Sequence, residues 1–273
     1  MSLSLLVVAS ETPDQQAARR KRAGQASHET FADTLRRIDG DVRLDAVNCV
    51  VDEGVPALDR YDGVLFAGSP IQMFRRTEET RAAAAFMARV FESGVPSFGS
   101  CAGLQIATVA SGGTVEARGE GVEAGFARGI VALEPAHPML AGRGLTWDAL
   151  AMHSSEVGRR PPGMTVLART RDTSVEAAAI RHGPGIHWGV QYHPEIAPGE
   201  VAQAVRAQTD AIVAQGMARD AAEVEAYADR IAAFGDDPER RDLAWQLGVQ
   251  RAVAREGWRL LEIANFLRHL RAA

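Results

Sequence analysis

The sequence predicts an α/β fold: a mostly parallel sheet flanked by helices, with a helical C-terminal extension. Up to residue 113, short apolar runs alternate with segments of helical spacing, an order that is typical of a parallel sheet covered on both faces. After residue 113, strand-like runs follow one another without helical spacing, so antiparallel strands are expected to join the sheet. From residue 198 onward, helical spacing predominates.

The first half of the chain is expected to alternate strands and helices. The expected strands span residues 3–9, 42–51 and 61–70, and the expected helices span residues 26–38 and 77–91. Thr77 is the expected N-cap of the second helix. Residues 10–25 are polar and basic and predict a solvated loop, which lies near the end of the first strand and could border a site there.

The second half places short strand-like runs before a helical tail. These runs span residues 114–117, 129–133, 147–152, 165–169, 176–180 and 185–191. Helical spacing covers residues 198–216 and 221–234, a break falls at residues 235–238, and residues 242–270 predict one long helix or two.

Length, charge and cysteine content argue against several classes of protein. A chain of 273 residues is long enough for one large domain, or for a domain with an appendage. The net charge of −5 does not suggest nucleic-acid binding, and no apolar run approaches the ~18 residues of a membrane helix. Cys49 and Cys101 make neither a disulfide framework nor a zinc-type pair, so we expect a cytoplasmic protein without a metal or another cofactor.

Residues 94–113 carry the strongest functional signal. An apolar run ends at Phe98, a Gly-x-Cys-x-Gly turn places Cys101 at its centre, and a helical pattern follows. Strand, sharp turn and helix with a thiol at the apex form the layout of a nucleophile elbow. Such a turn requires small neighbours, and Gly99 and Gly103 are small. The helix N-terminus would favour the thiolate of Cys101.

A candidate base lies at the end of a later strand. His193 and Glu195 follow the apolar run of residues 185–191, and positions i and i+2 of an extended chain point to the same side. Glu195 could therefore orient the imidazole while His193 faces the thiol. Because Gly68, Cys101 and His193 all follow apolar runs, we expect them at the C-terminal edge of the sheet, where α/β sites form.

These motifs together resemble one family. The Gly-x-Cys-x-Gly-x-Gln elbow, the upstream Gly-Ser-Pro turn, a His-Ser pair and the Tyr-His-Pro-Glu segment occur in the order found in class I, triad-type glutamine amidotransferases. The chain most resembles single-domain proteins similar to the amidotransferase half of GMP synthase. The resemblance implies the flavodoxin-like fold of that family over residues 1–197. Residues 198–273 would be a helical extension whose last helix packs back on the same domain.

The resemblance also implies a role for each matching residue. Cys101 would attack the side-chain amide of glutamine, His193 would pass a proton to the departing ammonia, and Glu195 would support His193. A glutamyl thioester would form, and ammonia would pass to an unidentified acceptor. The implied oxyanion hole consists of Gly68, Ser69 and Ala102, and the implied substrate-binding residues are Gln105, His153, Ser154 and Ser155. Ser155 stands where the family usually has Asp, which leaves that part of the glutamine pocket less well defined.

Several alternatives stay open at this point. No synthetase domain is expected in this chain, so a separate synthetase subunit could use the ammonia. A stand-alone hydrolase of γ-glutamyl peptides or γ-glutamyl amines would use the same chemistry. A non-catalytic regulatory subunit with the same fold is a further alternative, and assembly as a homo-oligomer is also open. The related cysteine peptidase and chaperone group usually has His directly after the Cys, where this chain has Ala102.

Overall fold

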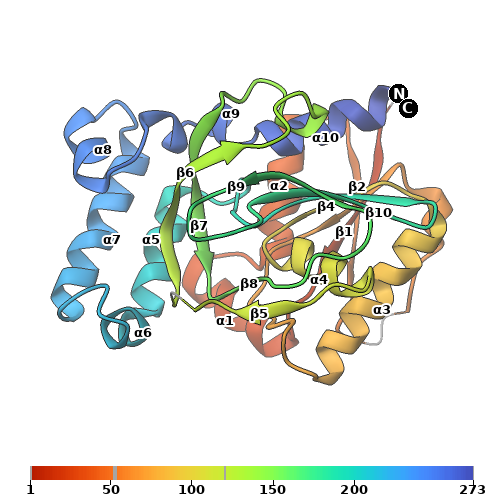
Figure 1. The fold of residues 1–273 in the computed structure, drawn as a ribbon, viewed down its shortest axis with the longest axis horizontal. Helices are drawn as coiled ribbons and strands as arrows, with labels where there is room; N and C mark the ends of the chain where they lie inside the picture. Colours follow the sequence, from red (N-terminus) through yellow and green to blue (C-terminus); the bar gives the residue numbers. More distant parts are fainter. Residues whose placement is uncertain (1, 52–53, 120, 273) are drawn as a thin grey trace.

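A nine-stranded sheet forms the centre of the computed structural model, which describes residues 2–51, 54–119 and 121–272 (Figure 1). Within the described residues its strand order is β2-β1-β3-β4-β11-β10-β9-β6-β7. The strands are β1 Ser4–Ala9, β2 Arg43–Asn48, β3 Gly63–Phe66, β4 Ser97–Ser100, β6 Glu123–Ala132, β7 Thr146–His153, β9 Met164–Arg169, β10 Ala177–His182 and β11 Gly185–Val190. A small second sheet pairs β5 Val115–Ala117 with β8 Ser155–Val157.

The sheet changes direction at β11. Strands β2, β1, β3, β4 and β11 pair in parallel, whereas β10, β9, β6 and β7 pair antiparallel to their neighbours. The change occurs because only residues 183–184 separate β10 from β11, and a connection this short can join only antiparallel strands. The α/β fold with a parallel sheet is confirmed, and so are the antiparallel strands expected after residue 113.

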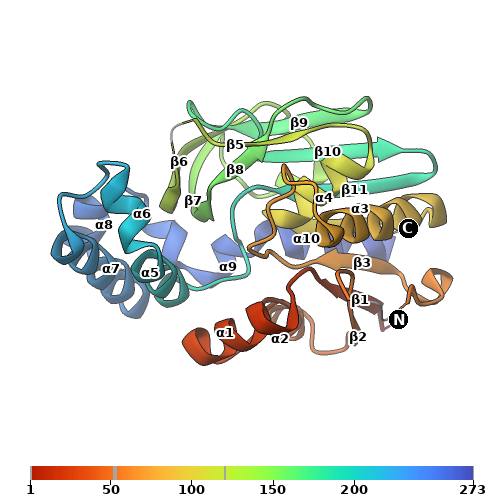
Figure 2. The same ribbon diagram turned by 90° about the horizontal axis from the view of Figure 1, so that it is seen from below.

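Helices cover both faces of the parallel part. The helices are α1 Pro13–Ala23, α2 Ser27–Ile38, α3 Glu78–Ser93, α4 Ala102–Ala110, α5 Pro198–Ala207, α6 Thr209–Ala214, α7 Ala221–Asp236, α8 Arg241–Leu247, α9 Glu256–Arg259 and α10 Leu261–Ala272. Along β1, Leu5 and Val7 pack in the core beneath α2 and α10. Leu6 and Val8 pack in the opposite core, with α3 and α4. This alternation is the period of two that a sheet buried on both faces requires. In Figure 2, α3 lies nearer to the viewer than α10, and the two helices belong to opposite cores.

The predicted loop over residues 10–25 is wrong, because α1 occupies most of it. Thr12 and Gln15 form a capping box at the start of α1, Pro13 is its first residue, and Gly24 ends it at φ +82°. The helix buries none of its residues, so it lacks the apolar periodicity from which helices are usually inferred. In the sequence, only the capping residues at its two ends indicate this helix.

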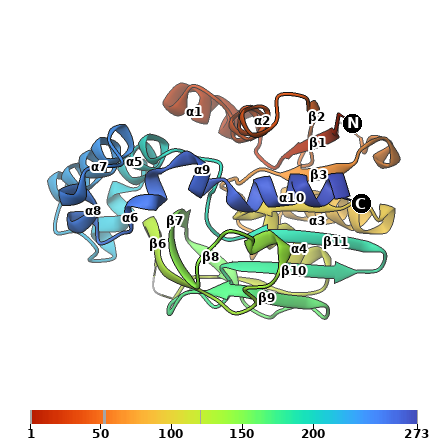
Figure 3. The same ribbon diagram turned by 90° about the horizontal axis from the view of Figure 1, so that it is seen from above.

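The C-terminal segment packs against two parts of the sheet. Helices α5 to α8 lie at one end of the molecule and share a core with β6 and β7. Residues 242–270 were expected to form one long helix or two, but they contain three α-helices, α8, α9 and α10, and Gly248 ends α8 at φ +65°. Helix α10 lies across the parallel strands (Figure 3). There the Phe266 ring centroid is 5.7 Å from that of Phe98 and 5.8 Å from that of Trp188. A domain division at residue 197 stays a prediction.

None of the helices that the structure describes is long and apolar enough to cross a membrane. A cytoplasmic location stays a prediction.

Candidate active site

Cys101 lies in a strained turn between β4 and α4. Its backbone has φ +48° and ψ −99°, and among the described residues it is the one non-glycine position with a positive φ. Such strain persists only where the surrounding structure holds the residue in place. The Cys101 N–H donates to the carbonyl of Val190 at the end of β11, at 2.7 Å. The elbow is therefore attached to the strand that leads to His193.

The small residues beside Cys101 are required by packing. Neither Gly99 nor Gly103 has a positive φ. A Cβ on Gly99 would lie 2.7 Å from the Cα of Gly103, and a Cβ on Gly103 would lie 2.9 Å from the Cβ of Phe66 on β3. The elbow backbone thus approaches its neighbours too closely for any side chain at these two positions.

His193 and Glu195 form a buried pair next to the elbow. The Nδ1 atom of His193 lies 2.8 Å from Oε1 of Glu195, and the His193 N–H donates to the carbonyl of Leu150 at 2.8 Å. Burial alone lowers the pKa of His193. The carboxylate of Glu195 and the thiolate of Cys101 outweigh burial and hold this pKa well above its ordinary value. The structure thus brings Cys101, His193 and Glu195 together, as the sequence suggested, while their catalytic roles stay predictions.

Gly68 lies directly against the His193 ring. A Cβ at Gly68 would lie 2.5 Å from Cε1 of His193 and 3.5 Å from Oε1 of Glu195. Among the described residues, the N–H groups of Gly68, Ser69 and Ala102 have no hydrogen-bond acceptor. Ala102 is the first residue of α4, where an N–H has no partner within the helix. These donors suit the predicted oxyanion hole.

The sequence predicted Gln105 and Ser155 as substrate-binding residues. In the structure these two residues contact each other near the nucleophile. The Nε2 atom of Gln105 donates to the Ser155 carbonyl at 2.9 Å and to Oε1 of Gln191 at 3.1 Å. The Ser155 hydroxyl donates to Oε1 of Gln105 at 2.9 Å. Gln191 in turn places Nε2 at 3.5 Å from Sγ of Cys101. Sequence reasoning missed Gln191, although it directly precedes the Tyr-His-Pro-Glu segment.

The other two predicted substrate-binding residues adjoin a separate ionic cluster. His153 has Nδ1 at 3.0 Å from the Ser155 carbonyl and Nε2 at 2.7 Å from Oε2 of Glu123. The carbonyl of Ser154 accepts from the N–H of Arg118 at 3.0 Å, and Arg118 also pairs with Glu123. Both ring nitrogens of His153 therefore lie beside polar groups of the protein itself.

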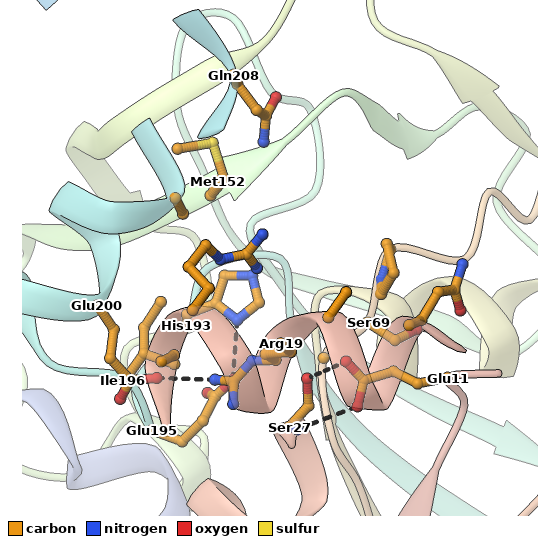
Figure 4. A pocket seen from close by; sticks show the side chains of 17 residues that line it. Glu11, Arg19, Ser27, Ser69, Met152, His193, Glu195, Ile196, Glu200 and Gln208 are labelled. Atoms are coloured by element: carbon orange, nitrogen blue, oxygen red, sulfur yellow. Dashed lines mark hydrogen bonds and ion pairs between the residues drawn. The ribbon is translucent and has the colours of Figure 1, made fainter. Parts of the chain in front are cut away.

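A pocket of about 310 Å³ opens beside the His193–Glu195 pair (Figure 4). Its lining residues are Glu11, Gln15, Ala18, Arg19, Arg22, Ala23, Ser27, Gly68, Ser69, Pro70, Met152, His193, Glu195, Ile196, Glu200, Ala204 and Gln208. Neither Cys101 nor any of the four predicted substrate-binding residues is in this lining.

Two helices that flank the pocket are joined by an ion pair. The guanidinium of Arg19 on α1 lies 2.8 Å from the carboxylate of Glu200 on α5. The buried carboxylate of Glu11 accepts from the hydroxyl of Ser27 at 2.9 Å and from its N–H at 3.0 Å. Arg22 lines the pocket and, among the described residues, forms no ion pair. The basic run after the first strand thus borders the site, as the sequence allowed.

Comparison with known proteins identifies the family. Residues 23–209 match the family model described as "Glutamine amidotransferase class-I". The chain belongs to the class I glutamine amidotransferases. It is 32% identical to a γ-glutamyl-L-1-hydroxyisopropylamide hydrolase from a Pseudomonas species, over 98% of this chain and 93% of the relative. It is 28% identical to one subunit of a glutamine-hydrolysing GMP synthase from Ignicoccus hospitalis, over 63% of this chain and 85% of that relative.

Solved structures share the amidotransferase fold. A glutamine amidotransferase from Thermotoga maritima superposes on the whole of this chain and over its own whole length, with a TM-score of 0.67 and 12% identity. A second glutamine amidotransferase, from Methylobacillus flagellatus, covers 98% of this chain and 95% of its own, with a TM-score of 0.64 and 17% identity. At these identities the likeness concerns the fold alone.

Proposed function

We propose that this class I amidotransferase hydrolyses γ-glutamyl amides whose amine is larger than ammonia, using Cys101, His193 and Glu195. The pocket beside His193 is the observation that carries this proposal. The relative from Pseudomonas, which aligns over nearly the whole of both chains, is named for the hydrolysis of such an amide and supports it.

The first half of the proposed reaction transfers the γ-glutamyl group to the enzyme. The thiolate of Cys101 attacks the γ-carbonyl carbon, and the C–N bond breaks as the tetrahedral intermediate collapses. Protonated His193, whose pKa is held high, donates its proton to the leaving nitrogen. The N–H groups of Gly68 and Ala102 would stabilise the developing oxyanion. The products of this half are a γ-glutamyl thioester and a free amine.

The second half releases glutamate. Neutral His193 takes a proton from a water molecule, and the resulting hydroxide attacks the thioester carbon. The C–S bond then breaks, so Cys101 returns to its thiolate form and glutamate leaves. Glu195, at 2.8 Å from Nδ1, stabilises the imidazolium that forms in this half.

The position and size of the pocket favour a leaving group larger than ammonia. His193 must reach the leaving nitrogen, so the leaving group lies on the His193 side of the scissile bond. The pocket lies on that side and measures about 310 Å³. Ammonia is close to the size of a water molecule, whose share of liquid volume is about 30 Å³. The space therefore accommodates an amine with several further non-hydrogen atoms.

Hydrolysis of glutamine itself, with ammonia passed to a separate synthetase subunit, is the second candidate. It was the leading expectation from the sequence, and the relationship to a glutamine-hydrolysing GMP synthase favours it. The chemistry on Cys101 is the same in both candidates. The two candidates differ in the leaving group: an amine larger than ammonia in the first, and ammonia in the second.

Turnover of paired substrates tests the proposal. We expect purified protein to release amine from γ-glutamyl ethylamide with a kcat/KM about tenfold or more above that for L-glutamine, a difference of roughly 1.4 kcal/mol in transition-state binding. The Cys101→Ala variant is the control for both substrates. Equal or faster Cys101-dependent turnover of glutamine would favour the second candidate, and turnover that survives Cys101→Ala would remove Cys101 from the mechanism.

A further inference from the structure

A continuous line of hydrogen bonds ends at the sulfur of Cys101. It begins at Ser155 on β8, passes through Gln105 on α4 and Gln191 after β11, and closes on Sγ of Cys101 at 3.5 Å. The other two heavy-atom distances along the line are 2.9 and 3.1 Å. We call this line the amide relay. None of its members lines the pocket beside His193.

The direction of the relay is fixed by one main-chain carbonyl. The Ser155 carbonyl can only accept a hydrogen bond, so the end of the Gln105 amide that faces it must be Nε2. The second hydrogen of Nε2 then points at Gln191, so the atom of Gln191 that receives it must be Oε1. The remaining end of the Gln191 amide, Nε2, therefore donates to Cys101.

Burial prevents the relay from reversing or exchanging with water. The residues Ser155, Gln105 and Gln191 are all buried, and the Gln191 side chain is fully inaccessible. The Ser155 hydroxyl holds Oε1 of Gln105 at 2.9 Å, which occupies the other end of that amide. The N–H of Gln191 donates to the carbonyl of Glu176 at 2.8 Å, and this fixes the backbone from which the side chain starts.

We propose that Gln191 is a hydrogen-bond donor to the Cys101 thiolate and that Gln105 and Ser155 are the positioning residues that orient it. A donor to a charged acceptor stabilises that charge more than a donor to a neutral one. The side-chain Nε2–H of Gln191 consequently favours the thiolate over the thiol, from a direction other than that of His193. The same donor stabilises the sulfur when the thioester breaks and Cys101 becomes the leaving group, because a less basic thiolate leaves faster.

This role differs from the one that the family resemblance implied. Gln105 and Ser155 were expected to hold the substrate, but here their polar groups are used on each other and on Gln191. A purely structural explanation is that the three side chains only satisfy one another inside the core. That explanation predicts a change in stability on substitution and none in the acidity of Cys101.

The pH dependence of Cys101 alkylation by iodoacetamide tests the relay, followed peptide by peptide by mass spectrometry on the full-length protein. Gln191→Met keeps a long unbranched side chain but removes the donor, and we expect the apparent pKa of Cys101 to rise by about one unit. Gln105→Met should raise it less, because Gln191 keeps its donor but loses its orientation. Gln203→Met, on α5, is the matched control and should leave the profile unchanged.

Cys49 provides an internal reference in the same experiment. Burial raises the pKa of its thiol to about 12, so it should stay unreactive while Cys101 is titrated. An unchanged Cys101 profile in folded Gln191→Met would overturn the proposal.

If Gln191→Met does not fold, Gln191→Glu has the same shape and supplies the test. Its carboxylate would repel the thiolate, so the pKa of Cys101 should rise further than in Gln191→Met. An unshifted profile there would equally overturn the relay. Because this readout needs no substrate, it stands or fails independently of the proposed γ-glutamyl amide activity.

Discussion

The two sides of the candidate site are built in opposite ways. On the nucleophile side, Cys101, Gln105 and Gln191 are buried, and close-packed glycines and main-chain hydrogen bonds hold them in place. On the pocket side, α1 buries none of its residues and contacts α5 through the Arg19–Glu200 pair. In the proposed reaction, the core would position the reacting groups, while a surface helix would shape the space for the leaving group. We expect substitutions on the nucleophile side to lower the rate for every substrate. Substitutions on the pocket side should change the kcat/KM of one substrate relative to another.

Removal of the nucleophile is the largest expected effect. Cys101→Ala should reduce kcat on any γ-glutamyl substrate by about 10⁴-fold or more, as loss of a triad member does elsewhere. Alanine is small enough for the strained turn, so we expect the melting temperature of the variant to change little. Thermal denaturation would measure this. Substantial residual activity would mean that the chemistry does not use this thiol.

A single methyl group at Gly68 should be almost as damaging. Gly68→Ala would place Cβ at 2.5 Å from Cε1 of His193, so the ring must move, and a shift of about 1 Å at a catalytic group can cost about 10²-fold in rate. Gly199→Ala on α5 is the matched control, because a Cβ there meets nothing within 4 Å. Comparable kcat values for the two variants would show that the position of the His193 ring is less constrained than the packing indicates.

The His193–Glu195 pair should appear in the pH dependence of stability. Because the pKa of His193 is raised in the folded protein, its contribution is complete below the unfolded value of about 6.5 and is lost as pH rises through the folded value. Glu195→Gln should therefore lower the free energy of unfolding by about 2 kcal/mol near pH 6, and by less at alkaline pH. Urea unfolding across this range checks the slope.

Glu92→Gln, which changes an exposed carboxylate on α3, is the control for that measurement. A difference between Glu195→Gln and wild type that does not vary with pH would contradict the raised pKa of His193.

The smallest effect is expected on the pocket side. Arg22 lines the pocket without an ion pair among the described residues, so it can meet a carboxylate on the leaving group. Arg22→Gln should lower kcat/KM for γ-glutamylglycine relative to γ-glutamyl ethylamide by about fivefold, since an exposed charge pair contributes up to about 1 kcal/mol. Lys21→Gln removes the same charge from a neighbouring position outside the lining and should change neither value. An equal fall for both substrates would show that Arg22 supports the shape of the pocket rather than the binding of a carboxylate.

Features of the fold that depend on local sequence pattern, such as the positions of strands and their ends, could be predicted from the sequence. The order of strands and helices, the Thr77 cap and the meeting of Cys101 with His193 all follow from apolar runs and turn residues whose meaning is local. Helix α1 was missed because its signal lies in its caps, without an apolar face.

The orientation of buried polar side chains could not be predicted in the same way. The direction of Gln105 depends on a carbonyl of β8, a strand far away in the chain that forms only by pairing with β5. Nε2 of His153 lies 2.7 Å from Oε2 of Glu123 on the neighbouring strand, a contact that the sequence did not suggest, and its predicted role in substrate binding stays a prediction. The partner of a buried polar side chain depends on which residues the fold brings beside it. Hydrophobic periodicity in the sequence does not indicate which residues these are.

The packing of α10 links the assembly of the site to protein synthesis. Phe266 fills the space between Phe98 on β4 and Trp188 on β11, the two strands that lead to Cys101 and His193. A nascent chain on the ribosome has made both strands before this ring emerges, so their shared face, which Phe31 of α2 also contacts, is not fully covered until α10 has been synthesised. The apolar packing over this face of β4 and β11 is therefore completed only when the last residues of the chain have been synthesised.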